Sequence, residues 1–64
     1  MVRVNGREMD IAGKTIEEYL VMSAYDRRRV AIECNDEIVP KAAYDQVVLK
    51  DGDSIEVVSF VGGG

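Results

Sequence analysis

The amino-acid sequence predicts an α+β domain, in which a mixed sheet of four to five strands carries one main helix on one face. Three observations support this class. The chain has 64 residues, enough for one small domain and too few for two cores. Its apolar fraction of 47% is ordinary for a folded chain. Only one stretch has the apolar spacing of an amphipathic helix, and the other apolar stretches are short and strand-like.

Residues 1–11 predict a β-hairpin. Val2 and Val4 alternate with a polar residue, and the same alternation returns at Met9 and Ile11. Between them, Asn5-Gly6 is the dipeptide that tolerates the positive φ angles of a type I′ turn. The two strands should therefore pair directly across this turn.

A helix is predicted to begin after Thr15. Thr15 followed by Glu18 matches the capping box, in which each side chain satisfies a backbone N–H at the start of the helix. The apolar stripe of this helix consists of Ile16, Tyr19, Leu20 and Ser23 or Ala24. We expect the helix to end near Ala24 and the polar, cationic segment 25–29 to form a loop into the next strand.

Residues 30–61 predict the remaining strands. Val30, Ile32 and Cys34 share one face of a strand, so Cys34 should point into the core. The later expected elements are a short strand at 37–39 ended by Pro40, one helical turn within 41–46, a brief strand at 47–49 and a β-rich run at 54–61.

The last strand is expected in the middle of the sheet. Ile55 and Val57 share one face, and they can lie beneath the helix if this strand sits between earlier strands, parallel to the first. That arrangement is a β-grasp topology. We expect residues 1–61 to form the β-grasp domain and residues 62–64 to form a flexible glycine tail.

The composition argues against several classes of protein. Cys34 is the single cysteine and histidine is absent, so neither an internal disulfide nor a Cys/His zinc site can form within the chain. The lone thiol and the lack of a secretory segment predict a cytoplasmic protein, and no stretch is apolar enough to span a membrane. The net charge of −4 argues against nucleic acid or membrane as partner and favours a basic protein surface.

The candidate catalytic and ligand-binding groups have simpler structural explanations. Cys34 lacks a neighbouring histidine base and is expected to be an inert core thiol. The carboxylate pairs at 17–18 and at Asp51 and Asp53 have the spacing of a helix start and a turn, so we expect no metal site. The arginines 27–29 lack interleaved aromatic residues, and a solvated loop explains them better than a phosphate site.

The last three residues are the remaining candidate. Gly62, Gly63 and Gly64 have no side chains, so an extended tail could pass through a narrow channel in another protein and present the Gly64 carboxylate there. A frayed end or a cloning remnant is the alternative, because fixing each residue costs about 1–2 kcal/mol.

Six motifs follow one another along essentially the whole chain. They are Val4-Asn5-Gly6, the stretch 15–20, the stretch 28–33, Asn35 with 37–40, the stretch 49–53 and Phe60-Val61-Gly62-Gly63-Gly64. In this order and spacing they resemble the ThiS-type sulfur carriers of thiamine biosynthesis, which are ubiquitin-like β-grasp proteins of the ThiS/MoaD superfamily. Cys34, where a larger aliphatic residue is common, and the short helix depart from the family pattern.

The resemblance implies a carrier that other enzymes act on, with no catalytic residue and no bound cofactor of its own. It implies that a ThiF-like adenylating enzyme consumes ATP to activate Gly64, that a sulfur donor such as a cysteine desulfurase supplies the sulfur, and that the resulting thiocarboxylate serves a ThiG-like thiazole synthase. Related carriers serve molybdopterin, cysteine or tRNA thiolation, and these remain alternatives. So do a non-reactive β-grasp binding module and a protein modifier that forms isopeptide bonds.

A docking surface is predicted beside the tail. Val58 and Phe60 have the opposite parity to Ile55 and Val57, so they should lie on the sheet face that the helix leaves open. With Val61, they are the predicted partner-docking residues; a loop covering them is the alternative.

Overall fold

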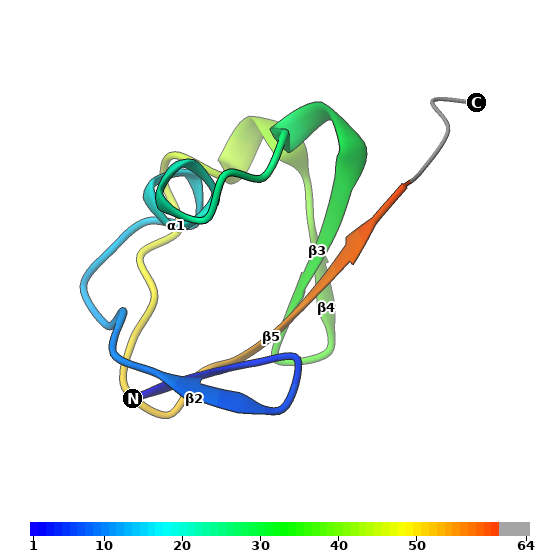
Figure 1. The fold of residues 1–64 in the computed structure, drawn as a ribbon. Coiled ribbons are helices and arrows are strands. Elements are labelled where there is room, and N and C mark those ends of the chain that lie inside the picture. The colour runs from blue at the N-terminus through cyan, green and yellow to red at the C-terminus, as the bar shows by residue number, and fades with distance from the viewer. Residues whose placement is uncertain (61–64) are drawn as a thin grey trace.

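A five-stranded mixed sheet carries one α-helix on one face in the computed structural model, which describes residues 1–60 (Figure 1). The described elements in chain order are β1 Val2–Val4, β2 Arg7–Met9, α1 Ile16–Met22, the 3₁₀ helix η1 Arg27–Arg29, β3 Val30–Cys34, β4 Glu37–Val39, the 3₁₀ helix η2 Lys41–Ala43 and β5 Ser54–Ser59. The predicted α+β class is confirmed.

The N-terminal hairpin forms as predicted. Asn5 and Gly6 both have positive φ angles, of 50° and 84°, which is the backbone requirement of a type I′ turn. Across this turn, β1 and β2 pair in antiparallel register, with Val4 opposite Arg7.

The capping box at the start of α1 is also confirmed. The backbone N–H of Glu18 donates to the Thr15 hydroxyl oxygen (3.0 Å), and the backbone N–H of Thr15 donates to the Glu18 carboxylate (2.8 Å). Two of the N–H groups that a helix start leaves without a partner are thus satisfied.

The helix ends at Met22, two residues before the expected position. Ala24 has a φ of 61°, and the N–H groups of Ala24 and Tyr25 donate back to the carbonyls of Val21 (3.2 Å) and Leu20 (2.9 Å). These two bonds are those of a Schellman motif, which closes a helix with one left-handed residue. Glycine normally takes that position, and alanine there gives no sequence signal for the helix end.

The expectation of a loop at residues 25–29 is wrong for its second half. Residues Arg27–Arg29 form η1, and the Asp26 carboxylate caps this turn by accepting the backbone N–H of Arg28 (2.9 Å). Aspartate is a common N-cap residue of helical turns, so Asp26 was a signal from which this turn could have been predicted.

The strand order β2-β1-β5-β3-β4 confirms the predicted β-grasp topology. β5 lies between β1, to which it is parallel, and β3, to which it is antiparallel. In Figure 1, β5 runs from the end of the domain near the N terminus toward the opposite end. The expected brief strand at 47–49 is only an isolated bridge between Val48 and Thr15, whereas the expected turn within 41–46 is present as η2.

The hydrophobic core lies between the sheet and α1. Every strand except β2 and β4 contributes fully buried side chains, and Tyr44 and Leu49 complete the core from the irregular segment between η2 and β5. The buried residues are Val2, Val4, Ile11, Ile16, Tyr19, Leu20, Val30, Ile32, Tyr44, Leu49, Ile55 and Val57. α1 covers only this face of the sheet, and the other face has no helix packed on it in the part of the chain that the structure describes.

Replacing Ala24 with glycine should stabilise the protein by about 0.5–1 kcal/mol, because glycine adopts the left-handed conformation without the steric cost of a Cβ atom. The expected rise in Tm is about 4–7 °C by thermal melting followed by circular dichroism. Ala12→Gly is the matched control: Ala12 is exposed and is not among the residues with positive φ. That variant should lower Tm, and an equal change in both variants would contradict the assignment.

Candidate functional site

Two of the predicted docking residues, Val58 on β5 and Phe60 directly after it, are exposed at the open face of the sheet. Ile55 and Val57 are buried beneath α1, while Val58 is 53% exposed and Phe60 is 54% exposed. The alternation of the strand therefore places the two pairs as their parity predicts, and no described loop covers the exposed pair. Their role in docking stays a prediction. Val61, Gly62, Gly63 and Gly64 lie outside the described residues, and so does the boundary expected after residue 61.

The end of β5 is held from both sides. The Asn5 side chain donates to the Val57 carbonyl (3.2 Å) and accepts the Val57 N–H (2.8 Å), which prolongs the β1–β5 pairing beyond the end of β1. On the other side, the Phe60 N–H donates to the Arg29 carbonyl (2.7 Å). Because main-chain bonds flank Val58, the exposed pair has a defined position relative to the sheet.

Further side chains share the open face with Val58, as the strand register requires. Ala31 on β3 lies opposite Val58, and Glu33 on β3 lies between Ile38 on β4 and Glu56 on β5. Ile38 is one of the most exposed apolar residues described. We call Ala31, Ile38, Val58 and Phe60 the apolar patch.

Glu33 and Glu56 are exposed and directly opposite each other in register. Like charges in directly opposite positions destabilise a sheet. The pair is thus unfavourable for the fold and puts two carboxylates beside the apolar patch, where they suit a basic partner surface.

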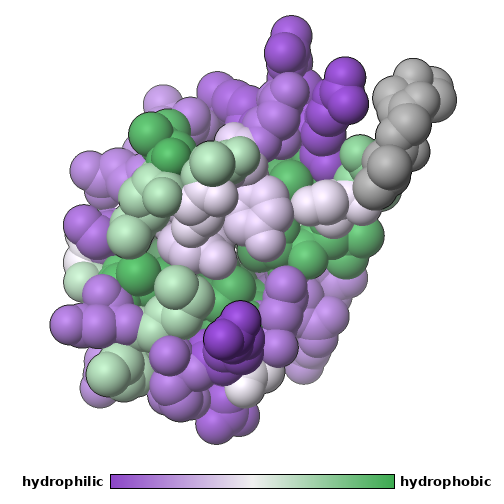
Figure 2. All heavy atoms as spheres, viewed as in Figure 1, coloured by the Kyte–Doolittle hydropathy of each residue, from purple (hydrophilic) through white to green (hydrophobic). Residues whose placement is uncertain are grey.

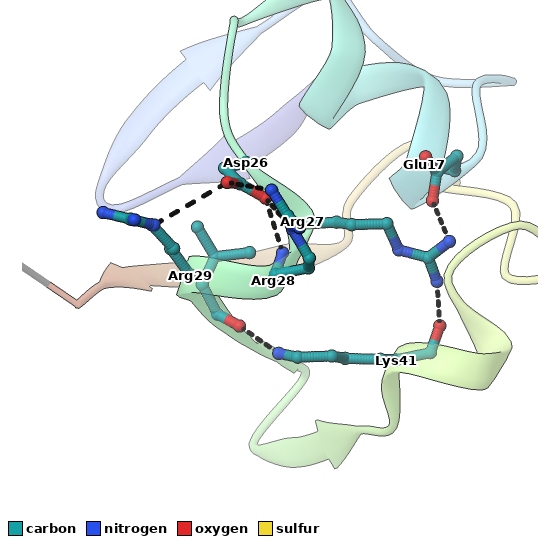
Figure 3. A network of polar contacts seen from close by, with 7 residues as sticks. Glu17, Asp26, Arg27, Arg28, Arg29 and Lys41 are labelled. Carbon is teal, nitrogen blue, oxygen red and sulfur yellow. Dashed lines mark hydrogen bonds and ion pairs between the residues drawn. The ribbon is translucent and has the colours of Figure 1, made fainter. Parts of the chain in front are cut away.

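Asp26 and the three arginines of η1 form a hydrophilic turn beside the end of β5. Its arginines have two different kinds of surroundings (Figure 3). Arg27 is held by the body of the domain: it forms an ion pair with Glu17 (3.4 Å), donates to the Lys41 carbonyl (2.7 Å) and lies over the Tyr44 ring. These contacts, which join α1, η1, η2 and the residue after η2, were missed from the sequence because the partners are ten or more residues apart. Arg27 therefore stabilises the fold.

Arg28 and Arg29 are the exposed part of this turn. Both form ion pairs with Asp26, at 3.3 Å and 3.7 Å. The hydrogen bonds and charge of Arg28, with a smaller contribution from Arg29, lower the pKa of the Asp26 carboxyl. The ionised Asp26 carboxylate ties the turn together, and the lowered pKa extends its ionised range toward more acidic pH.

Cys34 packs against the core from the end of β3, as predicted, and is partly exposed. Burial is the main cause that raises the pKa of its thiol, and the nearby Asp53 carboxylate adds to the effect. A raised pKa keeps the thiol protonated at neutral pH, the less nucleophilic form. The geometry thus supports an inert thiol.

The carboxylate pairs take part in local structure. Glu18 completes the capping box, Asp51 pairs with the N-terminal ammonium group, and Asp53 accepts the Lys50 N–H (2.8 Å) and an Asn35 side-chain N–H (3.1 Å). Within residues 1–60, no three His, Cys, Asp or Glu side chains gather as a metal site would need. The same residues form no pocket, and none of their helices has the length and apolar character to cross a bilayer.

Comparison with known proteins relates the whole chain to one family. Residues 2–64 match the model of the ThiS family. The chain is 40% identical to the sulfur carrier protein ThiS of Bacillus subtilis over 68 residues, with both chains covered completely. It is 48% identical over 62 residues to a thiazole synthase of Paramagnetospirillum magneticum, covering 95% of this chain and 19% of that protein. The chain thus spans about a fifth of the length of this relative and of a thiazole synthase from Magnetococcus marinus.

Solved structures agree with this relation. The crystal structure of the thiamine biosynthesis protein ThiS from Geobacter metallireducens superimposes with a TM-score of 0.76 at 33% identity, covering 98% of this chain and 97% of that one. The two proteins therefore share the β-grasp arrangement described above.

Replacing Glu56 with glutamine should raise the free energy of unfolding by about 0.2–0.5 kcal/mol, because it removes the repulsion with Glu33 across the strands. The gain should disappear in high salt, which screens exposed charges. Urea unfolding of the variant and of wild type, at low and at high salt, measures the gain in stability and its loss on screening.

Glu37→Gln is the matched control, since it removes the same charge from a residue opposite Cys34 instead of a carboxylate. Equal stabilisation by the two variants would mean that net charge, and not the opposed pair, is the cause.

Proposed function

Because the chain belongs to the ThiS family, we propose that it is a sulfur carrier and that the Gly64 carboxylate is its reactive group. The observation that carries this proposal is the family match, which runs through all three terminal glycines. The fold supports it, since β5 leads directly from the centre of the sheet toward these residues.

The proposed chemistry takes two steps because a carboxylate oxygen is a poor leaving group. An adenylating enzyme of the ThiF type joins the Gly64 carboxylate to the AMP part of ATP and releases pyrophosphate. A sulfur nucleophile at the oxidation level of sulfide then attacks the acyl carbon, AMP leaves, and Gly64 ends in a thiocarboxylate. A sulfur donor such as a cysteine desulfurase supplies the sulfur atom as a persulfide. An external thiol reductant, which is oxidised to a disulfide, brings the outer sulfur of this persulfide to the level of sulfide.

The acceptor we propose is a thiazole synthase of the ThiG type. Two relatives that carry the name thiazole synthase contain a segment similar to nearly all of this chain within a much longer protein. Carrier and synthase parts joined in one polypeptide favour the thiamine pathway over molybdopterin, cysteine or tRNA thiolation.

The carrier needs no catalytic group or bound cofactor of its own in this scheme. ATP is bound and consumed by the activating enzyme, and Gly62 and Gly63 allow the tail to enter a narrow channel of the partner. We place these reactions in the cytoplasm, where ATP is available and Cys34 stays reduced.

Docking, in this proposal, uses Val58 and Phe60 together with Val61 next to the tail. Val58 and Phe60 are more than half exposed, and they lie where β5 approaches the tail. Exposed apolar side chains surrounded by polar ones are common anchors of protein interfaces. The same residues would position the tail for both the activating enzyme and the synthase.

Incubation of the chain with a cognate activating enzyme, ATP and a sulfur donor should replace one oxygen atom of Gly64 by sulfur. Intact-mass spectrometry, with fragmentation of the C-terminal residues, reads the change and its position. Deletion of Gly64 should abolish it, because the carboxylate then ends about 3.5 Å short of the reacting position.

The deletion should leave the fold unchanged, since the buried core that the structure describes is formed by residues from Val2 to Val57. A wild-type chain that keeps its mass in the presence of an enzyme active on another carrier would contradict the function.

Replacing Phe60 with alanine should lower kcat/KM for adenylation by about tenfold or more, as expected for a central apolar anchor, with the loss mainly in KM. Pyrophosphate release with saturating ATP measures it. Met22→Ala is the matched control, because Met22 is an equally exposed large apolar residue on α1, away from β5. Unchanged adenylation kinetics in Phe60→Ala would remove Phe60 from the docking surface.

A further inference from the structure

Two exposed arginines next to the base of the tail have no role in the chemistry above. We propose that Arg28 and Arg29 bind carboxylates on the surface of the activating enzyme, around the mouth of the channel that receives the tail. This inference rests on the proposed function and adds to it the chemistry of the partner surface.

The position of these arginines is set by the strand that leads to the tail. The Arg29 carbonyl accepts the Phe60 N–H at 2.7 Å, and Val30 lies opposite Ser59 in register. η1 is therefore joined to the end of β5 by main-chain pairing. In Figure 2, strongly hydrophilic atoms lie near the point where the described chain ends, with apolar atoms close by.

The turn presents its charges in a fixed arrangement. The Asp26 carboxylate caps η1, and the Arg29 N–H donates to the Asp26 carbonyl (2.8 Å). The side chains remain accessible although they pair with Asp26: that of Arg28 is 84% exposed and that of Arg29 is 61% exposed. A partner carboxylate can therefore reach the free N–H groups of both guanidinium ions.

The local charge differs in sign from that of the whole chain. The network in Figure 3 holds two more positive than negative side chains, although the chain has a net charge of −4. Its charged members are Glu17, Asp26, Arg27, Arg28, Arg29 and Lys41. The sequence-based expectation of a basic partner surface follows from the average charge and does not apply to this end of the domain.

The charged side chains on the two sides of Val58 have opposite signs. Along the chain from Arg29 through β3 to Glu33, the sign changes over four residues, about 13 Å of strand. Glu56 lies opposite Glu33 on one side of Val58, and Phe60, whose N–H donates to the Arg29 carbonyl, lies on the other side. A partner with acidic groups at the channel mouth and basic groups farther away can dock in only one orientation.

Partner carboxylates fit these arginines better than phosphate groups do. The tail spans up to about 14 Å from Phe60 to Gly64, so in an extended tail the reacting carboxylate and the ATP phosphates lie well beyond the turn. Nucleic acid is disfavoured because Asp26 is part of the turn and none of its residues is aromatic.

The test compares the double variant Arg28→Gln and Arg29→Gln with wild type in the adenylation assay, at low and at high salt. We expect kcat/KM to fall about three- to tenfold at low salt, as for two charges at the rim of an interface. Most of the loss should be in KM, and the dependence on salt should become weaker. Arg28→Lys with Arg29→Lys should recover most of the activity, because lysine keeps the charge.

The matched control is Arg7→Gln with Lys14→Gln, which removes the same charge from exposed residues on β2 and before α1. Thermal melts of both double variants establish that the fold is retained. A control that loses as much activity as the arginine variant would overturn the inference, because net charge would then be the cause.

The remaining outcomes distinguish a failure of the proposed arginine contacts from a failure of the proposed carrier function. If wild type is adenylated and the arginine variant has the same kcat/KM and the same salt dependence, the inference is overturned and the function stands. If wild type is not adenylated, both fail. Binding of a single-stranded RNA by wild type that is lost in the arginine variant, with adenylation unchanged, would overturn the assignment to a protein partner.

Discussion

The pairing of the last strand with the first is the interaction on which this fold depends. β5 is the central strand of the described sheet, with β1 on one side and β3 on the other. It also supplies Ile55 and Val57 to the core. Asn5 extends the pairing by two hydrogen bonds to Val57, so the turn that begins the domain also holds the strand that ends it. Val58 and Phe60 take their position on the open face from this strand and its pairing with β3.

Much of this arrangement follows from local patterns in the sequence. Asn5-Gly6 determines the hairpin, Thr15 with Glu18 determines the helix start, and the parity of Ile55 and Val57 against Val58 and Phe60 separates the buried face from the open one. These signals work because each depends on residues within a few positions. The central place of β5 follows from them once a single helix has to cover the sheet.

Other features depend on contacts between distant residues, and local patterns did not predict them. Arg27 meets Glu17, Lys41 and Tyr44, so its structural role depends on how α1, η1 and η2 come together. Ala24 ends the helix in a conformation that its residue type disfavours. In the candidate site, the alternation of side chains along the last strand predicted the exposure of Val58 and Phe60. The positive charge beside them could not be predicted, because it depends on where η1 lies relative to β5. The tail lies beyond the described residues, and its role comes from the family.

The joining of both ends of the chain in one sheet has a consequence for synthesis of the protein. Without β5, the β1–β2 hairpin and the β3–β4 pair have no strand between them, and the core lacks Ile55 and Val57. A ribosome must therefore release nearly the whole chain before the sheet can close, since strand pairing between distant segments comes late. We expect products that stop before β5 to stay unfolded and open to proteases, because they lack the strand that joins the two halves of the sheet. A folded copy of the domain is therefore one whose translation has already passed β5, the strand that precedes the glycines.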